Sequence, residues 1–197
     1  MHAHLLQHIL AVTGIIGIWF TLFCETGLFF GFLLPGGSLM FLAGILASQG
    51  KLSIWELTIG SMVAVFIGYQ VGYWFGEKFG HWLHNRKDSW LFKKEYLAKA
   101  HDFYERHGFF AILVGRFVPV VRTFVPIIAG IGQMPKKPFL MANILGSIIW
   151  VAAFVFLGYF LGHRYHHLTH LILPALVGII IITCIPIIIV WIKESRK

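Results

Sequence analysis

Apolar residues fill most of this 197-residue chain, and they occur in long stretches separated by short polar ones. Six stretches have the composition of membrane helices, which need about 20 apolar residues to cross the hydrocarbon core. They are Ile9–Cys24, Leu28–Ala47, Ile54–Phe75, Phe109–Ile131, Phe139–Leu161 and Leu171–Ile192. Because membrane-spanning backbone must satisfy its own hydrogen bonds, the pattern predicts an all-α integral membrane protein. We expect one multi-pass domain over residues 1–197.

Two of these stretches are interrupted by residues that an ordinary membrane-spanning helix avoids. Pro35 and Gly36 break the second stretch, since proline lacks a backbone donor and glycine favours a turn. The fourth stretch contains two prolines and two arginines: Arg116, Pro119, Arg122 and Pro126. Two arginines at mid-depth on a lipid-facing helix would cost several kcal/mol. Both stretches are therefore predicted to be re-entrant, so that the chain turns inside the membrane and leaves on the side it entered.

The positive charges of the chain indicate its orientation. The net charge is +8, with 58% hydrophobic and only 12% charged residues. Six lysines and arginines lie in His81–His107, a pair begins at Lys136, and three more lie in residues 193–197. The positive-inside rule places these groups, together with both termini, on the cytoplasmic side of the membrane. Lys51 and the His163–His170 loop then face outside. Membrane topology accounts for the basic residues, so nucleic acid is not an expected partner.

An internal repeat divides the chain into two halves. When the chain is shifted by 86 residues, 10 of the 34 positions from Ala43 to Gly76 are identical. Each half contains a broken stretch followed by a full span, and the charges orient the halves oppositely. Inverted repeats with paired broken helices are typical of transporters, whose site lies where the breaks meet near the middle of the membrane.

The predicted organisation follows from this repeat. The first repeat covers about residues 23–80 and the second about 109–163, each a re-entrant helical hairpin followed by a transmembrane helix. An amphipathic cytoplasmic linker, about residues 88–107, joins them, and a plain solvated connector is the alternative for this segment. A C-terminal transmembrane helix is expected at 170–192.

The candidate site consists of charged and polar residues at or near the breaks. Arg116 and Arg122 have the rigid fork of donors that binds phosphate, and unwound backbone beside Pro119 and Pro126 would add free amides. Further expected contacts are Glu25, Pro35, Gly36 and Asn143. The structural alternative is an internal ion pair with Glu25, or an Arg122 side chain that reaches the membrane surface. Glu25 has three open roles: counter-ion, proton carrier, or interfacial carboxylate. Asn143 is first a candidate for helix–helix hydrogen bonding.

Other motifs indicate no enzyme chemistry. The histidines of residues 163–170 have spacings that suit an external metal site or a pH sensor, but no carboxylate or cysteine accompanies them. Cys24 and Cys184 lie in apolar stretches and match no metal or redox spacing. No phosphate-binding loop, zinc-protease sequence or nucleophile elbow is present. We expect no catalytic residue, no resident metal and no cofactor.

Several segments resemble a known family. Glu25 with Phe32-Leu33-Leu34-Pro35-Gly36, and the run from Gly68 to Gly76, are similar to the first half of DedA proteins, the SNARE-associated or VTT-domain family. The segment from Gly115 to Arg122, the Pro126–Gly130 segment with Met134, and Asn143 through Trp150 are similar to the second half. The resemblance spans about Phe23 to Gly162.

This resemblance implies a transport function. Bacterial members return undecaprenyl phosphate, a carrier lipid, from the outer to the cytoplasmic leaflet; others handle phospholipids or support proton-motive-force homeostasis, and eukaryotic relatives act as lipid scramblases. By position, the family's essential acid corresponds to Glu25 and its arginine pair to Arg116 and Arg122. The chain departs from the family pattern at Gly37 and Tyr69, where many members have Asp, and at Glu77, where a basic residue is usual.

The sequence thus predicts a flippase for a phosphate-bearing lipid, with undecaprenyl phosphate as the expected substrate. Since Gly37 and Tyr69 leave no second membrane acid, a two-acid proton relay is not expected. The alternatives are a proton-coupled or broad-specificity phospholipid transporter, and a membrane scaffold without transport. Arginines at the breaks favour transport, because a scaffold has no need of them.

Overall fold

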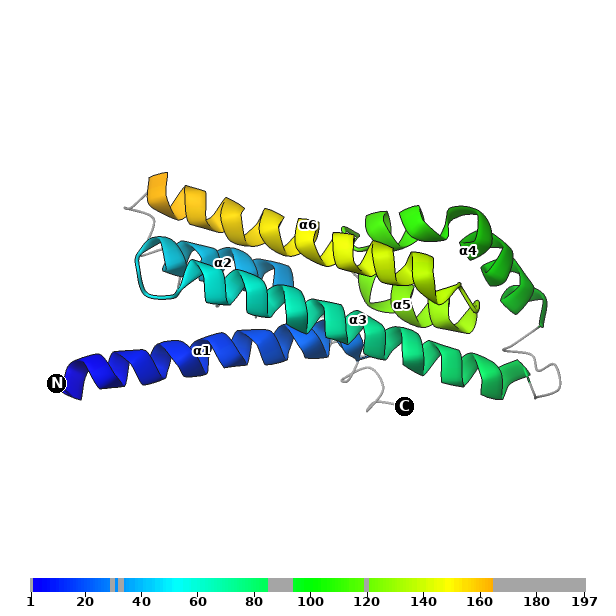
Figure 1. Ribbon diagram of the computed structural model, residues 1–197, viewed down its shortest axis with the longest axis horizontal. Helices are drawn as coiled ribbons and strands as arrows, with labels where there is room; N and C mark the ends of the chain where they lie inside the picture. The colour runs from blue at the N-terminus through cyan, green and yellow to red at the C-terminus, as the bar shows by residue number, and fades with distance from the viewer. Residues whose placement is uncertain (1, 29–30, 32–33, 85–93, 119–120, 165–197) are drawn as a thin grey trace, which may run out of the picture.

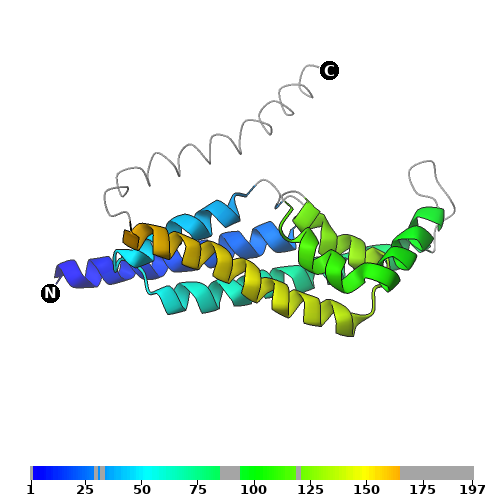
Figure 2. The same cartoon turned by 90° about the horizontal axis from the view of Figure 1, so that it is seen from above.

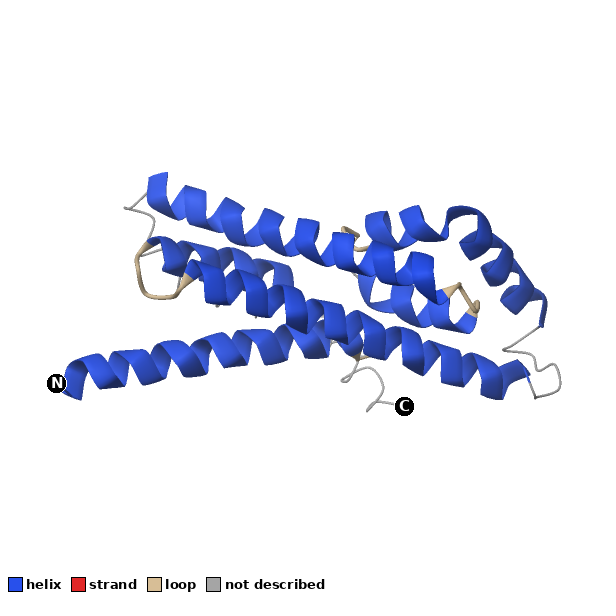
Figure 3. Ribbon diagram, in the orientation of Figure 1, coloured by secondary structure: helices blue, strands red, loops and turns tan. Residues whose placement is uncertain are grey.

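The computed structural model describes residues 2–28, 31, 34–84, 94–118 and 121–164, and every regular element in these ranges is a helix (Figure 3). The elements are α1 (His2–Gly27), α2 (Gly36–Ser48), α3 (Ile54–His84), α4 (Lys94–Gly115), α5 (Val121–Ile131) and α6 (Lys136–Arg164). The predicted all-helical class is confirmed. The expected C-terminal helix at 170–192 lies outside the described residues.

The helices fall into two lengths. Within α3 and α6, the segments Ile54–His81 and Lys136–Arg164 are long and apolar enough to cross a membrane. By contrast, α2 has 13 residues and α5 has 11. At 1.5 Å per residue these two helices are about 20 and 16 Å long, well short of the roughly 30 Å hydrocarbon core. Each short helix precedes a long one in the chain.

The short helices exchange partners between the two halves of the chain. Helix α2 packs mainly on α6, whereas α5 packs mainly on α3 (Figures 1 and 2). Each long helix also contacts the helix that opens its own half: α3 contacts α1, and α6 contacts α4. Each half therefore supplies its long helix as the packing surface for the other half's short helix.

Glycines make this exchanged packing close. A Cβ at Gly44 of α2 would overlap the α6 backbone at Val155, and a Cβ at Gly130 of α5 would overlap the α3 backbone at Tyr73. The two glycines are 86 positions apart, as in the predicted shift, whereas Val155 and Tyr73 are 82 apart. The 86-residue shift thus relates equivalent positions of the two short helices. Equivalent positions of α3 and α6 are 82 residues apart, which differs from the shift by about one helical turn.

Both short helices end in the same kind of turn. Lys51 N–H donates to Leu46 C=O and Met134 N–H donates to Ala129 C=O, each with a left-handed residue just before the donor. These left-handed residues are Gly50 (φ 70°) and Gln133 (φ 54°). The pattern is the Schellman motif, which satisfies the last carbonyls of a helix. It turns the chain sharply from each short helix into the following long one.

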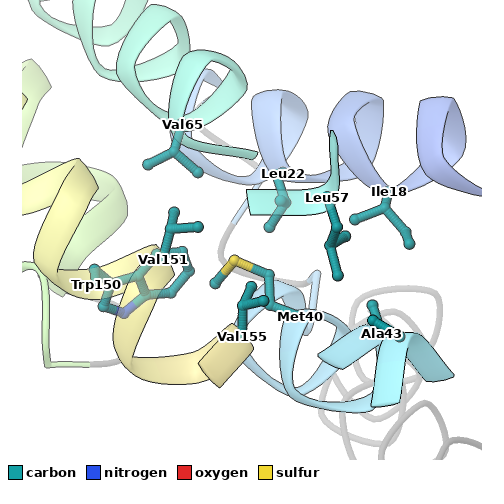
Figure 4. Packing of buried hydrophobic residues seen from close by; sticks show 10 residues of the cluster. Ile18, Leu22, Met40, Ala43, Leu57, Val65, Trp150, Val151 and Val155 are labelled. Carbon is teal, nitrogen blue, oxygen red and sulfur yellow. The ribbon is translucent and has the colours of Figure 1, made fainter. Parts of the chain in front are cut away.

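Two hydrophobic clusters flank the middle of the molecule. The first joins α1, α2, α3 and α6 (Figure 4): Ile18, Leu22, Met40, Ala43, Ala47, Leu57, Val65, Trp150, Val151 and Val155. The second joins α3, α4, α5 and α6: Tyr69, Tyr73, Tyr104, Ile112, Val125, Ala129, Met134, Phe139 and Ala142. The polar groups of the site lie where the two clusters meet, since Trp150 of the first cluster and Tyr69 of the second contact the arginines.

The N-terminal end differs from the prediction. Figure 1 shows that α1 begins at the same end of the molecule as the α2–α3 turn and stops midway along α3, where α2 begins. The helix predicted over Ile9–Cys24 is present within α1, but the N-terminus and Lys51 lie at the same end of the molecule and not at opposite ends as predicted. Helix α1 is therefore the helix that leads into the first break, before α2.

The α4 helix also differs from the expected boundary at residue 107. It runs without interruption from Lys94 to Gly115 and curves along its length (Figure 1). Tyr104 and Gly108 are buried, whereas Glu105, Arg106 and His107 are exposed, as in an amphipathic helix. The second half of the expected linker and the helix that leads into the second break are thus one helix.

Candidate functional site

The ends of four helices meet midway between the two ends of the molecule (Figure 1). Helices α1 and α4 stop there at Gly27 and Gly115, and α2 and α5 start there at Gly36 and Val121. Among the predicted site residues, Glu25 lies in the last turn of α1, Arg116 directly follows α4, and Arg122 lies in the first turn of α5. Breaks that are distant in sequence are therefore brought together in space.

Glu25 and Arg122 form an ion pair between the two halves. The Glu25 carboxylate is fully buried, and its Oε1 forms an ion pair with Nη2 of Arg122, whose side chain is 14% exposed. The other carboxylate oxygen lies against Gly36, where any Cβ would overlap it. The Arg122 guanidinium also lies 4.9 Å from the centre of the Trp150 ring. Glycine at position 36 thus makes room for the carboxylate at the start of α2, where the helix dipole favours an anion.

Arg116 is held entirely by neutral groups. Its residue is 1% exposed, and its Nη1 and Nη2 donate to Ser147 Oγ and Asn143 Oδ1, both at 2.7 Å. The guanidinium carbon stacks 3.7 Å from the centre of the Tyr69 ring. Its Nε is buried without a hydrogen-bond partner among the described residues. The structure therefore contains a buried cation beside hydroxyl, amide and aromatic groups, with no carboxylate paired to it in the described ranges.

Asn143 and Ser147 connect Arg116 to two long helices. Ser147 Oγ donates to the Asn143 C=O at 2.7 Å, one turn earlier in α6. The Asn143 Nδ2 donates to Phe66 C=O of α3 at 3.1 Å. Asn143 therefore accepts from Arg116 and bonds across to α3, so the predicted helix–helix role and the predicted site role belong to the same side chain.

Tyr69 links the two arginines and explains the backbone at Pro126. Pro126 lies inside α5, and its missing N–H would have bonded the C=O of Arg122, four residues earlier. The Tyr69 hydroxyl donates to that carbonyl instead, at 2.9 Å. Unwound backbone with free amides beside Pro126 is therefore a wrong prediction, because a side chain replaces the missing donor. The helix continues past the proline.

The other predicted residues have simpler outcomes. Pro35 is the N-cap residue of α2, with its C=O bonded to Leu39 N–H at 2.9 Å. Pro119 lies outside the described residues. Three groups were not predicted as part of the site: Ser147, Trp150 and Tyr69. Ser147 lies within the segment from Asn143 to Trp150 that resembles the family, and Tyr69 was noted only as a departure from the family pattern, so weak signals for both were present.

No group of three potential metal ligands occurs within the described ranges. Of the expected histidine cluster, His163 is described; it lies in the last turn of α6, is exposed, and stacks on Tyr159 with 6.4 Å between ring centres. The remaining histidines of that cluster and Cys184 lie outside the described residues. Cys24 is half-buried and carries a free thiol.

Comparison with known proteins gives a consistent set of relatives. The VTT domain matches residues 34–160. The chain is 38% identical to Protein DedA of Escherichia coli strain K12, an alignment that covers 98% of this chain and 91% of that protein. It is also 30% identical to Inner membrane protein YqjA of the same strain, over 72% of this chain and 64% of YqjA.

A third relative is an uncharacterized membrane protein of Mycobacterium leprae, 38% identical over 72% of this chain and 64% of that protein. No solved structure matches the chain. The VTT domain covers more than half of the chain, and the DedA similarity runs over nearly all of it. The protein is therefore a membrane protein of the DedA family, the VTT-domain proteins.

Proposed function

We propose that this protein moves a phosphate-bearing lipid between the leaflets of the bacterial inner membrane, without changing it chemically. The observation that carries the proposal is Arg116, a buried guanidinium in the middle of the molecule that is held by neutral groups only. A buried charge is stable when it is paired, and an anion that visits the site would supply the missing partner. Ionisable residues inside a membrane protein characteristically mark a substrate pathway.

The charges of the site support an anionic headgroup. Glu25 neutralises Arg122 while the site is empty, which leaves the charge of Arg116 uncompensated. A phosphate has enough oxygens to accept from two guanidinium forks, so it can bind Arg116 and displace Glu25 from Arg122. Glu25 is then the counter-ion of the resting site. Among the acids whose exposure the structure describes, which are Glu25, Glu56, Glu77 and Glu105, only Glu25 is buried. This gives the counter-ion role more support than a proton relay.

We further propose that the lipid is undecaprenyl phosphate and that it moves from the outer to the cytoplasmic leaflet. This part rests on the family resemblance and on a site that offers one phosphate-sized cluster of donors. A broad phospholipid transporter would use the same arginines with less discrimination. A membrane scaffold has less support, since it gives no reason for Arg116 to be buried.

The architecture we propose is an inverted repeat of two re-entrant hairpins, α1–α2 and α4–α5. It is supported by the exchanged packing of α2 and α5 and by their matching turns. The basic end with Lys136 faces the cytoplasm, and the end with Lys51 and the start of α1 faces outside. A cysteine at Lys51 will then react with an impermeant reagent from outside, and one at Lys137 only after the membrane is opened. Reaction of both from one face contradicts the inverted arrangement.

Transport in liposomes tests the function. Arg116→Ala and Arg122→Ala will abolish movement of undecaprenyl phosphate while the purified proteins keep their helical content. Arg116→Lys will recover part of the rate, because lysine keeps the charge but lacks the planar fork. Phosphatidylglycerol and phosphatidylethanolamine, measured in parallel, separate a specific flippase from a broad transporter. Normal transport by the double alanine variant contradicts the phosphate site.

A further inference from the structure

Two hollows lie along the contact between α3 and α6, on the outer side of the residues that hold Arg116. The first has a volume of about 310 Å³, and its walls are Met62, Val63, Phe66, Ile144, Ser147 and Ile148. The second has a volume of about 330 Å³, and its walls include Gln70, Trp74, Glu77, Lys136 and Leu140. Both are formed by the two helices that are long enough to cross the membrane. We call the two hollows together the α3–α6 groove.

The hollows follow one another along the membrane-crossing direction. Met62, Phe66, Gln70 and Trp74 are spaced by four residues, so they lie on one side of α3. On the antiparallel α6, the walls run from Ile148 in the first hollow to Lys136 in the second. From Met62 to Glu77 the groove extends about 22 Å, at 1.5 Å per residue. That length suits a lipid that lies along the helices within one leaflet, where half of the hydrocarbon core is about 15 Å thick.

Polarity changes along the groove in the way that it changes along a lipid. The first hollow is apolar apart from Ser147. The second contains the Lys136–Glu77 ion pair, with 2.9 Å between Nζ and Oε1, and the Gln70 Oε1, which is buried without a hydrogen-bond partner among the described residues. Lys136 is 74% exposed, and its ammonium has three donors, so it can bind an anion in addition to Glu77. Lys78, whose Nζ lies 4.1 Å from the centre of the Trp74 ring, adds a second cation at this end.

We propose that the α3–α6 groove binds the transported lipid from the side of the membrane, with its phosphate beside Lys136 and its hydrocarbon chain between Met62 and Ile148. This inference rests on the proposed function for the identity of the lipid. The chemistry that the groove recognises is a phosphate monoester on a long hydrocarbon chain. Both a polyprenyl phosphate and a phosphatidic acid present that chemistry.

The groove adjoins the buried arginine. Ser147 lines the first hollow and accepts from Arg116, so Arg116 lies directly behind this wall. The Asn143–Phe66 hydrogen bond crosses between α6 and α3 at the boundary of the two hollows, and Asn143 also holds Arg116. Separation of the helices at this one bond would open a path from the headgroup in the second hollow to Arg116. The groove is therefore the position from which a lipid of the leaflet on the Lys136 side reaches the buried site, or into which it is released.

Photo-cross-linking tests the groove, and the chain provides a matched control. Ile148 and Ile149 are neighbours of the same type with 45% and 47% exposure, but only Ile148 lines the groove. A benzophenone side chain is placed at either position in the full-length protein, in phosphatidylcholine nanodiscs that contain radiolabelled undecaprenyl phosphate. Position 148 will label at least fivefold more than position 149, and excess unlabelled lipid will remove the difference. Labelled phosphatidic acid in a parallel sample shows which of the two lipids the groove prefers.

Two further variants connect labelling with transport. Ile148→Trp and Val63→Trp fill the first hollow from α6 and α3, and both will slow transport at least fivefold, whereas Ile149→Trp will not. Lys136→Glu will weaken labelling at position 148, and the exchange Lys136→Glu with Glu77→Lys will restore it. Each variant is accepted only when it elutes as a single species with wild-type helical content, and using both walls keeps the test valid if one variant misfolds.

The possible outcomes separate the groove from the proposed function. Equal labelling at 148 and 149, or wild-type transport by both tryptophan variants, overturns the groove, even where Arg116→Ala still abolishes transport. Selective labelling at 148 together with normal transport by Arg116→Ala supports the groove as a lipid site and contradicts the proposed transport site.

Discussion

Arg116 and Arg122 lie six positions apart in the same arginine-proline segment, yet the residues around them differ in charge. Arg122 is paired with Glu25 and is partly exposed, whereas Arg116 is buried among Ser147, Asn143 and Tyr69. The sequence favours treating the two arginines as one unit. In the structure they are a neutralised charge and an uncompensated one, so variants of each have different consequences.

The first prediction concerns the ion pair. Glu25→Gln removes the carboxylate that competes with lipid phosphate for Arg122, so undecaprenyl phosphate will bind roughly tenfold more tightly, a change of about 1.4 kcal/mol. Release will be slower, and the transport rate in liposomes will fall. Glu56→Gln, at an exposed carboxylate, is the control. Unchanged affinity with a lost response to a proton gradient would instead identify Glu25 as a proton carrier.

The second prediction concerns the Tyr69 hydroxyl. Tyr69→Phe keeps the ring beside Arg116 but leaves the Arg122 carbonyl without its donor, which costs about 1–3 kcal/mol for a buried group. The thermal midpoint of the purified protein will therefore fall.

Pro126→Ala provides the internal check on this loss. Alanine restores the backbone N–H that bonds the Arg122 carbonyl in an ordinary helix, so Tyr69→Phe will be much less harmful in the Pro126→Ala background. Additive losses in the two variants would show that the hydroxyl does not replace the missing proline donor.

At the scale of helices and turns, matching turns differ in one residue that matters. Gly50 and Gln133 occupy the same left-handed position at the ends of α2 and α5. A side chain in this conformation costs about 1–2 kcal/mol, and glycine avoids the cost. The chain therefore carries strain at one turn that it avoids at the other.

A third prediction follows from this difference. Gln133→Gly will stabilise the protein by about 1 kcal/mol, and Gly50→Ala will destabilise it by a similar amount. Gln133 is exposed, and a Cβ at Gly50 meets no atom within 4 Å, so backbone strain is the main term in both variants. Thermal unfolding in detergent measures both. A loss of stability in Gln133→Gly would mean that the glutamine side chain contributes more than its backbone costs.

Local sequence signals predicted where the helices break, but not which helices lead into each break or how the helices after it pack. Proline and glycine act on their own neighbours, so Pro35-Gly36 and the Arg116–Pro119 region could be placed from sequence. The position of α2 beyond the first break depends on its contacts with α6. These contacts are remote in the chain and leave no local pattern. The role of Tyr69 was hidden for the same reason, because it compensates a proline 57 positions later.

On the scale of the whole molecule, the exchanged packing makes the two halves interdependent. Helix α2 contacts α6 far more than its own neighbour α3, and α5 rests on α3. Glycines at these contacts, such as Gly44 and Gly130, leave no room for adjustment. Neither half buries its short helix by itself.

The fourth prediction concerns the separate halves. Residues 1–84 or residues 94–197 expressed alone will be degraded, because each short helix lacks its packing surface. The two fragments expressed together will accumulate and co-purify, since the missing surface is supplied by the other fragment. Gly130→Leu in the second fragment will prevent co-purification by separating α5 from α3. Stable accumulation of either fragment alone would contradict the exchanged packing.

Because α2 packs on α6, it is synthesised well before the helix that forms its packing surface. Its packing surface on α6 leaves the ribosome roughly 100 residues after α2 itself, or about 5 to 20 seconds later at 5–20 residues per second. Throughout that interval a helix too short to span the bilayer must stay in or near the insertion machinery without its final neighbour. A nascent chain stalled before α6 should therefore remain bound to the insertase and be open to quality-control proteases. The order of the helices along the chain thus sets how long the insertion machinery must protect α2.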